Sequence, residues 1–153
     1  MAAGFSLAPG RLPVFRDILN ERLAAAAALP VAADIQVEAS IAVQGATIEL
    51  ASHIARLAPF GAGNEEPTFA VRRARVTRAD RVGREGSTIR VFVEGEGGGP
   101  RLKAMLFRAG DGALADAMLA RDGAPLHLAG HLRAEEWNGQ TTVCFAVTDA
   151  AAA

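Results

Sequence analysis

Cationic and aromatic side chains alternate with apolar ones in two neighbouring segments of the chain. Arg90 and Phe92 fall in one apolar segment, and Lys103 and Phe107 fall in the next one. Because successive side chains of a strand point to opposite faces, each segment would gather its cation and its ring on one face. Cations bind phosphates and rings stack on bases, as single-strand binding requires. Burial in a core or under a neighbouring domain is the alternative for either phenylalanine.

Two predicted loops carry further candidates for the same chemistry. The segment 80–86 holds Arg81 and Arg84 beside two glycines, which suits contacts with phosphate groups. Trp137 precedes Asn138-Gly139, a strong signal for a hairpin turn. At that tip the indole would either stack on a base or fold over the end of the sheet.

Basic residues are concentrated in the middle of the chain. Residues 68–108 carry ten basic against four acidic groups, a net charge of +6. Residues 1–67 carry −3 and residues 109–153 carry −4. Such a segment is the electrostatic footprint of a surface that binds polyanions. The alternative is a set of solvated strand positions, because clustering in sequence need not mean clustering in space.

The histidines do not predict a hydrolytic site. Two-metal phosphodiester cleavage needs several carboxylates and histidines around ions about 4 Å apart. His53 lies on a predicted helix, and His127 and His131 would stand about 13 Å apart on one strand. No glycine-rich nucleotide fingerprint occurs between a strand and a helix. We therefore expect this chain to contain no catalytic residue, metal site or cofactor.

The elements before residue 68 follow an α/β order. Residues 3–7 predict a short edge strand, and a helix begins at Pro13 and ends before Pro30. Alternation over 35–43 predicts a strand, and helical spacing over 48–57 a second helix with Thr47 as its cap. Because these elements are too few to close a core, we expect the tail of a larger α/β domain.

After residue 68 the pattern becomes β. Five strands are expected near residues 69–76, 89–93, 102–106, 126–132 and 142–147. A slip of the apolar phase predicts a bulge at Arg72-Arg73. Asp111 is the expected cap of a helix that Gly123 ends, and the final alanines are expected to fray. Three strands, a helix and two strands is the order of an OB-fold, although another small barrel stays open.

Cysteine usage and the apolar runs indicate a compartment. The single cysteine, Cys144, cannot form an internal disulfide, which suits a reducing cytoplasm. The first residues lack the basic-then-apolar order of a secretion signal, and no apolar run is long enough to span a bilayer. We expect a cytoplasmic protein.

The segment between the two patterns resembles a known family junction. Residues 57–67 read Leu-Ala-Pro-Phe-Gly-Ala-Gly-Asn-Glu-Glu-Pro, and Thr68-Phe69 follow. They resemble the Pro-Phe-Gly-x-Gly-Asn-x-x-Pro-x-Phe junction of the RecJ family of single-strand-specific DNA exonucleases, which joins the DHH-associated domain to a C-terminal OB-fold. Residues 1–7 look like the tail of that family's Gly-Gly-His-Ala-x-Ala-Gly segment, without its Gly-Gly-His half.

The resemblance implies an α+β organisation in three parts. Residues 1–58 would be the end of the DHH-associated domain, 59–67 the junction, and 68–150 a five-stranded OB-fold barrel. The parent enzyme would remove nucleotides 5′ to 3′ from single-stranded DNA in repair and recombination, using Mn²⁺ or Mg²⁺ in a catalytic domain outside this chain. The chain alone is expected to be inactive. Two origins of Met1 stay open, an internal methionine taken as a start or the end of a damaged gene.

Single-stranded DNA is the expected partner, together with the missing catalytic domain and other repair proteins. The candidate DNA-binding residues are Arg81, Arg84, Arg90, Phe92, Lys103, Phe107 and Trp137. Two alternatives remain. One is a stand-alone OB-fold module for single strands, and the other is a protein-docking OB domain without affinity for DNA. Burial of Phe92 and Phe107 against the N-terminal segment would favour docking.

Overall fold

A computed structural model gives the fold in two compact units, residues 1–34 and 35–153. The residues described are 4, 6–27, 34–120 and 122–153. In the first unit a 3₁₀ turn, Pro9–Arg11, leads into helix α1, Leu12–Ala27, which confirms the predicted helix. The predicted strand over 3–7 lies partly outside the described residues, and its described residues form no strand.

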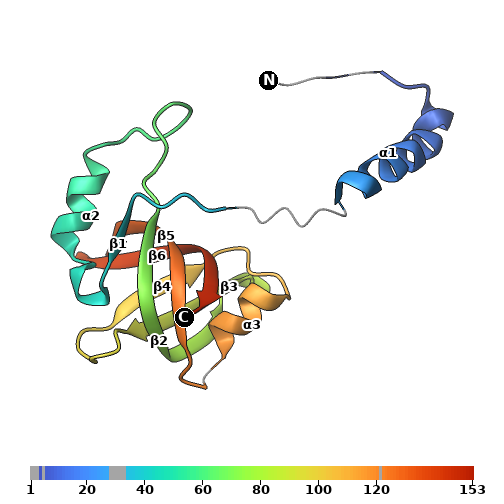
Figure 1. Cartoon of the computed structure of the whole chain (residues 1–153). Coiled ribbons are helices and arrows are strands. Elements are labelled where there is room, and N and C mark those ends of the chain that lie inside the picture. Colours follow the sequence, from blue (N-terminus) through green and yellow to red (C-terminus); the bar gives the residue numbers. More distant parts are fainter. Residues whose placement is uncertain (1–3, 5, 28–33, 121) are drawn as a thin grey trace. The chain divides into compact units, whose positions relative to one another are not determined.

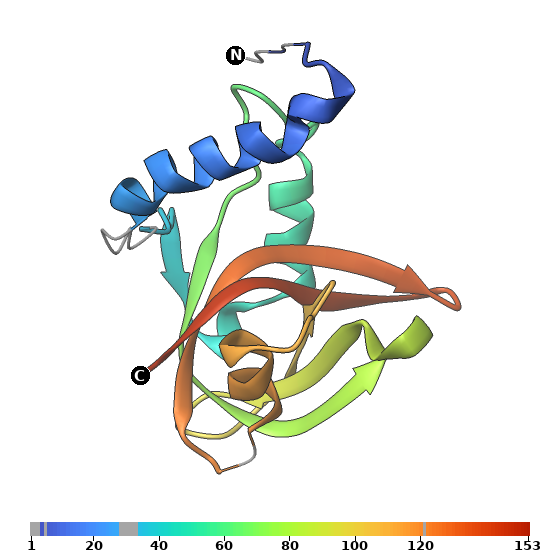
Figure 2. The same cartoon turned by 90° about the vertical axis from the view of Figure 1, so that its right-hand side faces the viewer.

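The second unit is a six-stranded sheet in which five strands close into a barrel (Figures 1 and 2). Around the ring, β2 pairs with β3, β3 with β4, β4 with β6, β6 with β5, and β5 again with β2. Helix α3, Ala113–Leu119, lies between the third and fourth strands of this ring along the chain. This arrangement is the predicted OB-fold. The strands are β1 Ala39–Ile41, β2 Phe69–Val82, β3 Thr88–Glu94, β4 Leu102–Leu106, β5 Pro125–Trp137 and β6 Gln140–Ala152.

Alternate residues of the barrel strands point inward and form one core. Helix α3 contacts β2, β3 and β6, and Met118 on this helix is fully buried. Burial of these large apolar side chains is the main favourable term for the fold. The largest fully buried residues are Phe145, Ile89, Met118, Leu128, Leu132, Val71, Val91 and Val93, with Cys144.

Strand β2 bends where the sequence predicts a bulge. Val71 pairs with Leu128 of β5, but the next paired residue on β2 is Ala74, opposite Leu126. Between them Arg73 has a φ of +50°, a conformation that single residues adopt at irregular positions of a strand. The bulge at Arg72-Arg73 is therefore confirmed, and it turns β2 from one part of the barrel wall to the next.

The residues just before the barrel pack on it. Strand β1 pairs in parallel with β2 over only three residues, so the strand predicted over 35–43 is too long. Its alternating pattern fits a half-buried strand, but backbone partners are available only over this short stretch. A 3₁₀ turn, Val43–Gly45, and helix α2, Ile48–Ala55, follow. Thr47 caps α2 as predicted, because its Oγ1 accepts a 3.1 Å hydrogen bond from the Leu50 N–H.

The junction is held by one asparagine side chain. The amide of Asn64 donates hydrogen bonds to the carbonyl oxygens of Leu57, at 3.0 Å, and Pro59, at 2.9 Å. Its backbone exchanges two hydrogen bonds with Gly61, and Gly63 between them has a φ of +83°. The segment is thus a closed turn that presents Phe60 to the edge of the core.

Three smaller predictions are wrong. Asp111 does not cap α3. The residue at the N-cap position is Gly112, which has no side chain, and the carboxylate of Asp111 binds Arg81 instead. The helix also ends at Leu119, before Gly123. The final alanines do not fray, since β6 continues to Ala152 opposite Leu126 of β5. Backbone hydrogen bonds of the ladder hold them despite the low strand preference of alanine.

The hairpin between β5 and β6 turns where the sequence places it. Asn138 and Gly139 have φ values of +51° and +74°, as the two central residues of a type I′ turn require. The predicted hairpin is therefore confirmed. No helix in the described part of the chain is long and apolar enough to cross a membrane.

Gly130 on β5 provides a test of barrel closure. A Cβ atom there would lie 2.1 Å from the backbone oxygen of Ala146 on β6. Because backbone atoms cannot move aside cheaply, we expect Gly130→Ala to lower the free energy of unfolding by about 1–3 kcal/mol or more, measured by urea denaturation. Gly97, which has nothing within 4 Å of such an atom, is the control, and Gly97→Ala should change stability by less than about 0.5 kcal/mol. Equal effects of the two substitutions would contradict this packing.

Candidate nucleic-acid interface

The outer face of β3 and β4 carries the residues that the sequence places there. Along β3 buried and half-buried residues alternate, with Arg90 and Phe92 on the outer face. Along β4 the same alternation leaves Lys103 and Met105 outside. The predicted orientation of both strands is therefore confirmed. In an OB-fold this face is the usual place for an oligonucleotide or oligosaccharide.

A row of three side chains crosses this face. Phe92 is opposite Arg78 of β2 on one side and opposite Lys103 of β4 on the other. An aromatic ring thus stands between two cations on three adjacent strands. Side chains directly opposite each other in a sheet have Cβ atoms about 4.5–5.5 Å apart, so the three groups are neighbours.

Arg78 is not among the candidate DNA-binding residues predicted from the sequence, because a second irregularity in β2 places it on the outer face. Counting alternate residues from the inward Val76 places Arg78 on the inner face. The pairing of β2 with β3 shifts between Val76 and Arg78, and the extra residue moves Arg78 outward. Its side chain is 64% exposed. Nothing in the sequence pattern reveals this shift, because Thr77 and Arg78 are both polar.

Carboxylates neutralise much of the basic segment. The Nζ atom of Lys103 lies 2.6 Å from Glu135 of β5, and Asp80 accepts from both Arg78, at 2.9 Å, and Arg90, at 3.5 Å. Four more basic residues between 68 and 108 have a carboxylate within 4.0 Å, namely Arg73, Arg75, Arg81 and Arg101. The three that have none among the described residues are Arg72, Arg84 and Arg108. The net charge of the segment therefore overstates its free positive charge.

The two arginines of the predicted first loop have different roles. Strand β2 extends to Val82, so Arg81 is still in the strand. Its guanidinium donates to the carbonyl oxygens of Gly86, at 3.3 Å, and Gly110, at 3.4 Å, and pairs with Asp111. Arg81 therefore braces two loops against each other. Arg84, in contrast, is exposed within the 3₁₀ turn Arg84–Gly86.

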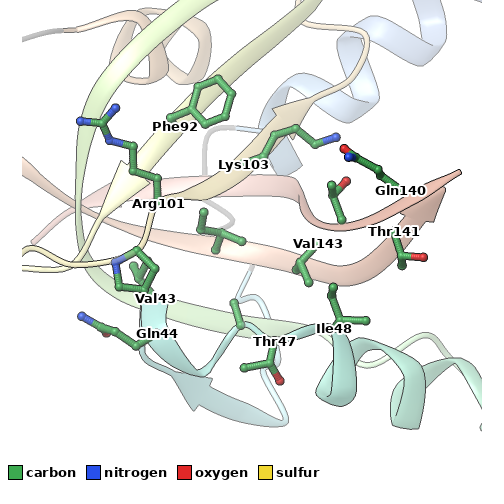
Figure 3. Close-up of a pocket in the computed structure, with 14 residues that line it drawn as sticks. Val43, Gln44, Thr47, Ile48, Phe92, Arg101, Lys103, Gln140, Thr141 and Val143 are labelled. Carbon is green, nitrogen blue, oxygen red and sulfur yellow. The ribbon is translucent and has the colours of Figure 1, made fainter. Parts of the chain in front are cut away.

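Phe92 lines a cleft at one end of the face (Figure 3). The cleft has a volume of about 770 Å³. One side consists of Phe92, Arg101 and Lys103, and the other of residues 43–48, with the β5–β6 hairpin at its end. The cleft therefore combines a ring, two cations and several polar groups. Sequence reasoning missed the contribution of residues 43–48, because they precede the junction.

Phe107 lies away from this cleft. It follows the last residue of β4, is 49% exposed, and lines a separate pocket with Arg108 and His131. The structure therefore does not bring Phe92 and Phe107 into one site. Trp137 ends β5 opposite Gln140, and its side chain lies outside the described residues.

His127, His131 and Cys144 serve the framework. His127 Nδ1 is 3.4 Å from the N–H of Arg73 at the bulge, and His131 Nδ1 is 3.0 Å from the carbonyl oxygen of Pro67. Cys144 is buried between β4 and β5, and this burial raises the pKa of its thiol to about 12. In the part of the chain that the structure describes, no three metal-ligating side chains lie together.

A comparison with known protein families gives a result that agrees with the closed five-stranded barrel. The model of the RecJ OB domain matches residues 37–149, most of the chain. The chain belongs to the RecJ OB domain family. The resemblance found in the junction is thereby confirmed. A comparison with curated proteins found no match.

Two solved structures of RecJ resemble the chain. Both come from Thermus thermophilus, one in complex with Mg²⁺ and one with Mn²⁺, and both are 24% identical to it. They have TM-scores of 0.63 and 0.64 and cover 96% and 97% of this chain, which spans 21% and 20% of their length. At this identity the likeness shows the fold alone. An SSB domain from Synechococcus sp., 22% identical over 54% of this chain and 91% of its own, has a TM-score of only 0.40.

An ion pair joins the RecJ OB barrel to the junction and predicts a pH dependence. Arg133 of β5 donates two hydrogen bonds to Glu66, one of them at 2.7 Å from Nε. This bonding lowers the pKa of Glu66 below its ordinary value of 4.5. A carboxylate with a lowered pKa in the folded state stabilises the protein above its unfolded pKa, and this contribution is lost as the pH falls through the folded pKa.

We therefore expect the thermal midpoint to fall between about pH 6 and pH 3, and to fall less in Glu66→Gln. Differential scanning fluorimetry over this range measures both. Glu65 is the matched control, because it is exposed and has no cation within 4.0 Å among the described residues. A Glu66→Gln curve that runs parallel to those of the wild type and Glu65→Gln would refute the prediction.

Proposed function

We propose that this RecJ OB domain binds single-stranded DNA across the outer face of β2, β3 and β4. The observation that carries the proposal is the row of Arg78, Phe92 and Lys103 in direct register. A ring between two cations can stack on a base while the flanking charges contact the phosphates on either side. Duplex DNA offers the same phosphates, but its bases are already stacked and paired. The face therefore suits single strands.

The remaining candidates extend this face in the proposal. Arg90 lies next to the row and forms an ion pair with Asp80. Arg84 and Phe107 are exposed side chains outside the row. Arg81 is engaged with two loops and contributes by holding them in place. Trp137 is a candidate by its position at the β5–β6 hairpin.

The parent protein is proposed to be a RecJ-like 5′ to 3′ exonuclease of DNA repair and recombination. The chain spans about a fifth of the RecJ chains that it matches, and it holds the OB domain. In this proposal the catalytic domain, with its Mn²⁺ or Mg²⁺ ions, is outside the chain, and residues 1–58 are the end of the DHH-associated domain. The chain alone would then bind DNA without cutting it, in the cytoplasm, and its partners would be that catalytic domain and other repair proteins.

The internal ion pairs set the expected strength of binding. A phosphate that approaches Lys103 competes with Glu135 at 2.6 Å, so part of the electrostatic gain is offset by the loss of an existing contact. The proposal therefore predicts moderate affinity with a marked dependence on salt. The exposed Phe107 does not meet the condition for a protein-docking domain that buries both rings.

The test measures binding of the purified chain to a fluorescent oligothymidylate of about 16 nucleotides, the upper end of the range for one OB-fold. Fluorescence anisotropy should show binding at low salt, with log K falling linearly with log salt concentration. Lys103→Met should weaken binding and reduce the slope by about 0.7, the value for one phosphate contact. Glu135→Gln should tighten binding, because it frees Lys103 for the phosphate.

Arg56→Met is the matched control. This arginine is exposed, lies at the C-terminal end of α2 and lines no part of the cleft. Its loss should leave the affinity and the salt slope unchanged. No binding of the oligonucleotide at low salt would overturn the proposal and leave the protein-docking alternative. Cleavage of the oligonucleotide by the purified chain with Mn²⁺ would contradict its expected inactivity.

A further inference from the structure

The cleft beside Phe92 has a wall that the barrel itself does not supply. Val43, Gln44, Thr47 and Ile48 face Phe92 across the cleft (Figure 3). They belong to the 3₁₀ turn Val43–Gly45 and to the start of α2, upstream of the junction. An OB barrel alone would leave this end of the strand face open. Here the face ends in a half-open cleft.

The wall is fixed in place by contacts with the barrel. Val43 is 4% exposed, and the amide of Gln44 donates a 3.1 Å hydrogen bond to the carbonyl oxygen of Gly98 in the β3–β4 turn. Gly95 of the same turn lies so close that a Cβ atom there would be 3.1 Å from Gln44. The absence of a side chain at Gly95 thus leaves room for Gln44. The cleft is therefore formed before any ligand arrives, which reduces the entropy lost on binding.

The chemistry of the lining matches a nucleobase. A base has two apolar faces and a polar edge, and the cleft offers the ring of Phe92 and the apolar side chains of Val43 and Val143. Amide and hydroxyl groups for the polar edge come from Gln140 and Thr141 of the β5–β6 hairpin. A volume of about 770 Å³ lies within the usual range of pockets for small molecules, about 300–1,000 Å³.

Two cationic side chains indicate where the sugar–phosphate backbone of the bound DNA would pass. Lys103 and Arg101 are on the same side of the cleft as Phe92, at the edge of the outer face. A base inserted between Phe92 and the wall would leave its phosphates near these two side chains. A neutral or apolar peptide would gain nothing from this placement of charge.

We propose that this cleft receives one unpaired base of the bound DNA strand, stacked on Phe92 and flanked on its other side by the wall of residues 43–48. The inference rests on the proposed binding of single-stranded DNA and adds where one base is held. A base within a duplex enters only after it is unpaired and unstacked. The cleft therefore makes the OB domain selective for single strands through a segment outside its barrel.

The test compares two ligands of about 16 nucleotides, an oligothymidylate and an oligonucleotide of abasic sites with the same backbone. The wild-type chain should bind the oligothymidylate about tenfold more tightly, as expected for one stacked base. Ile48→Trp fills the cleft from the wall and should reduce this ratio towards one, with the affinity for the abasic chain retained. Leu57→Trp is the matched control, because Leu57 is 58% exposed and does not line the cleft.

The outcomes separate this inference from the proposed function. If neither ligand binds the wild-type chain at low salt, the proposed function is overturned and this inference falls with it. If both bind but the wild-type chain does not distinguish them, or Ile48→Trp keeps the wild-type ratio, the cleft does not hold a base. If Ile48→Trp lowers the affinities for the oligothymidylate and the abasic oligonucleotide equally, the cleft holds the sugar–phosphate backbone of the DNA and not a base. Should Ile48→Trp lower the thermal midpoint, Thr141→Trp fills the cleft from the opposite hairpin.

Discussion

Closure of the sheet is the constraint on which the rest of the structure depends. Strand β2 has to pair with β3 along one edge and with β5 along the other. It does so by bending at Arg73, where the pairing with β5 skips to Ala74. Closure removes the free edges of the five barrel strands and gives them a common inside. Closure thereby gives each strand a defined outer face, on which the pairing of β2, β3 and β4 aligns Arg78, Phe92 and Lys103.

The close contact between β5 and β6 is part of the same constraint. The backbone of β6 approaches Gly130 so closely that no side chain fits there. Strand β6 lies between β4 and β5, and its residue at this level is the small, buried Cys144. Glu135 of β5 can therefore reach Lys103 of β4. The same geometry therefore builds the barrel and brings a carboxylate onto the candidate DNA-binding face. In the proposed function a phosphate competes with Glu135 for Lys103, so the number of basic residues in the segment overstates the charge available to a polyanion.

Local patterns predict most of the barrel, and the errors have physical causes. Alternation identifies β3 and β4, the phase slip identifies the bulge at Arg72-Arg73, and Asn138-Gly139 identifies the hairpin. These features depend on neighbours in sequence. The wrong cap at Asp111 and the ordered alanines at the end of β6 depend on distant partners, namely Arg81 and the backbone of β5.

The amino-acid sequence by itself determined the family, through the spacing of Pro59, Gly61, Gly63 and Asn64, and the order of strands and helix that makes an OB-fold. Tertiary structure alone decided which side chains share a site. A one-residue shift in β2 reverses the direction of Arg78, and the fold of residues 43–48 over the barrel creates the cleft. Both are consequences of pairing and packing between distant segments. A periodic pattern records which face of an element is buried, but it does not record which element lies opposite.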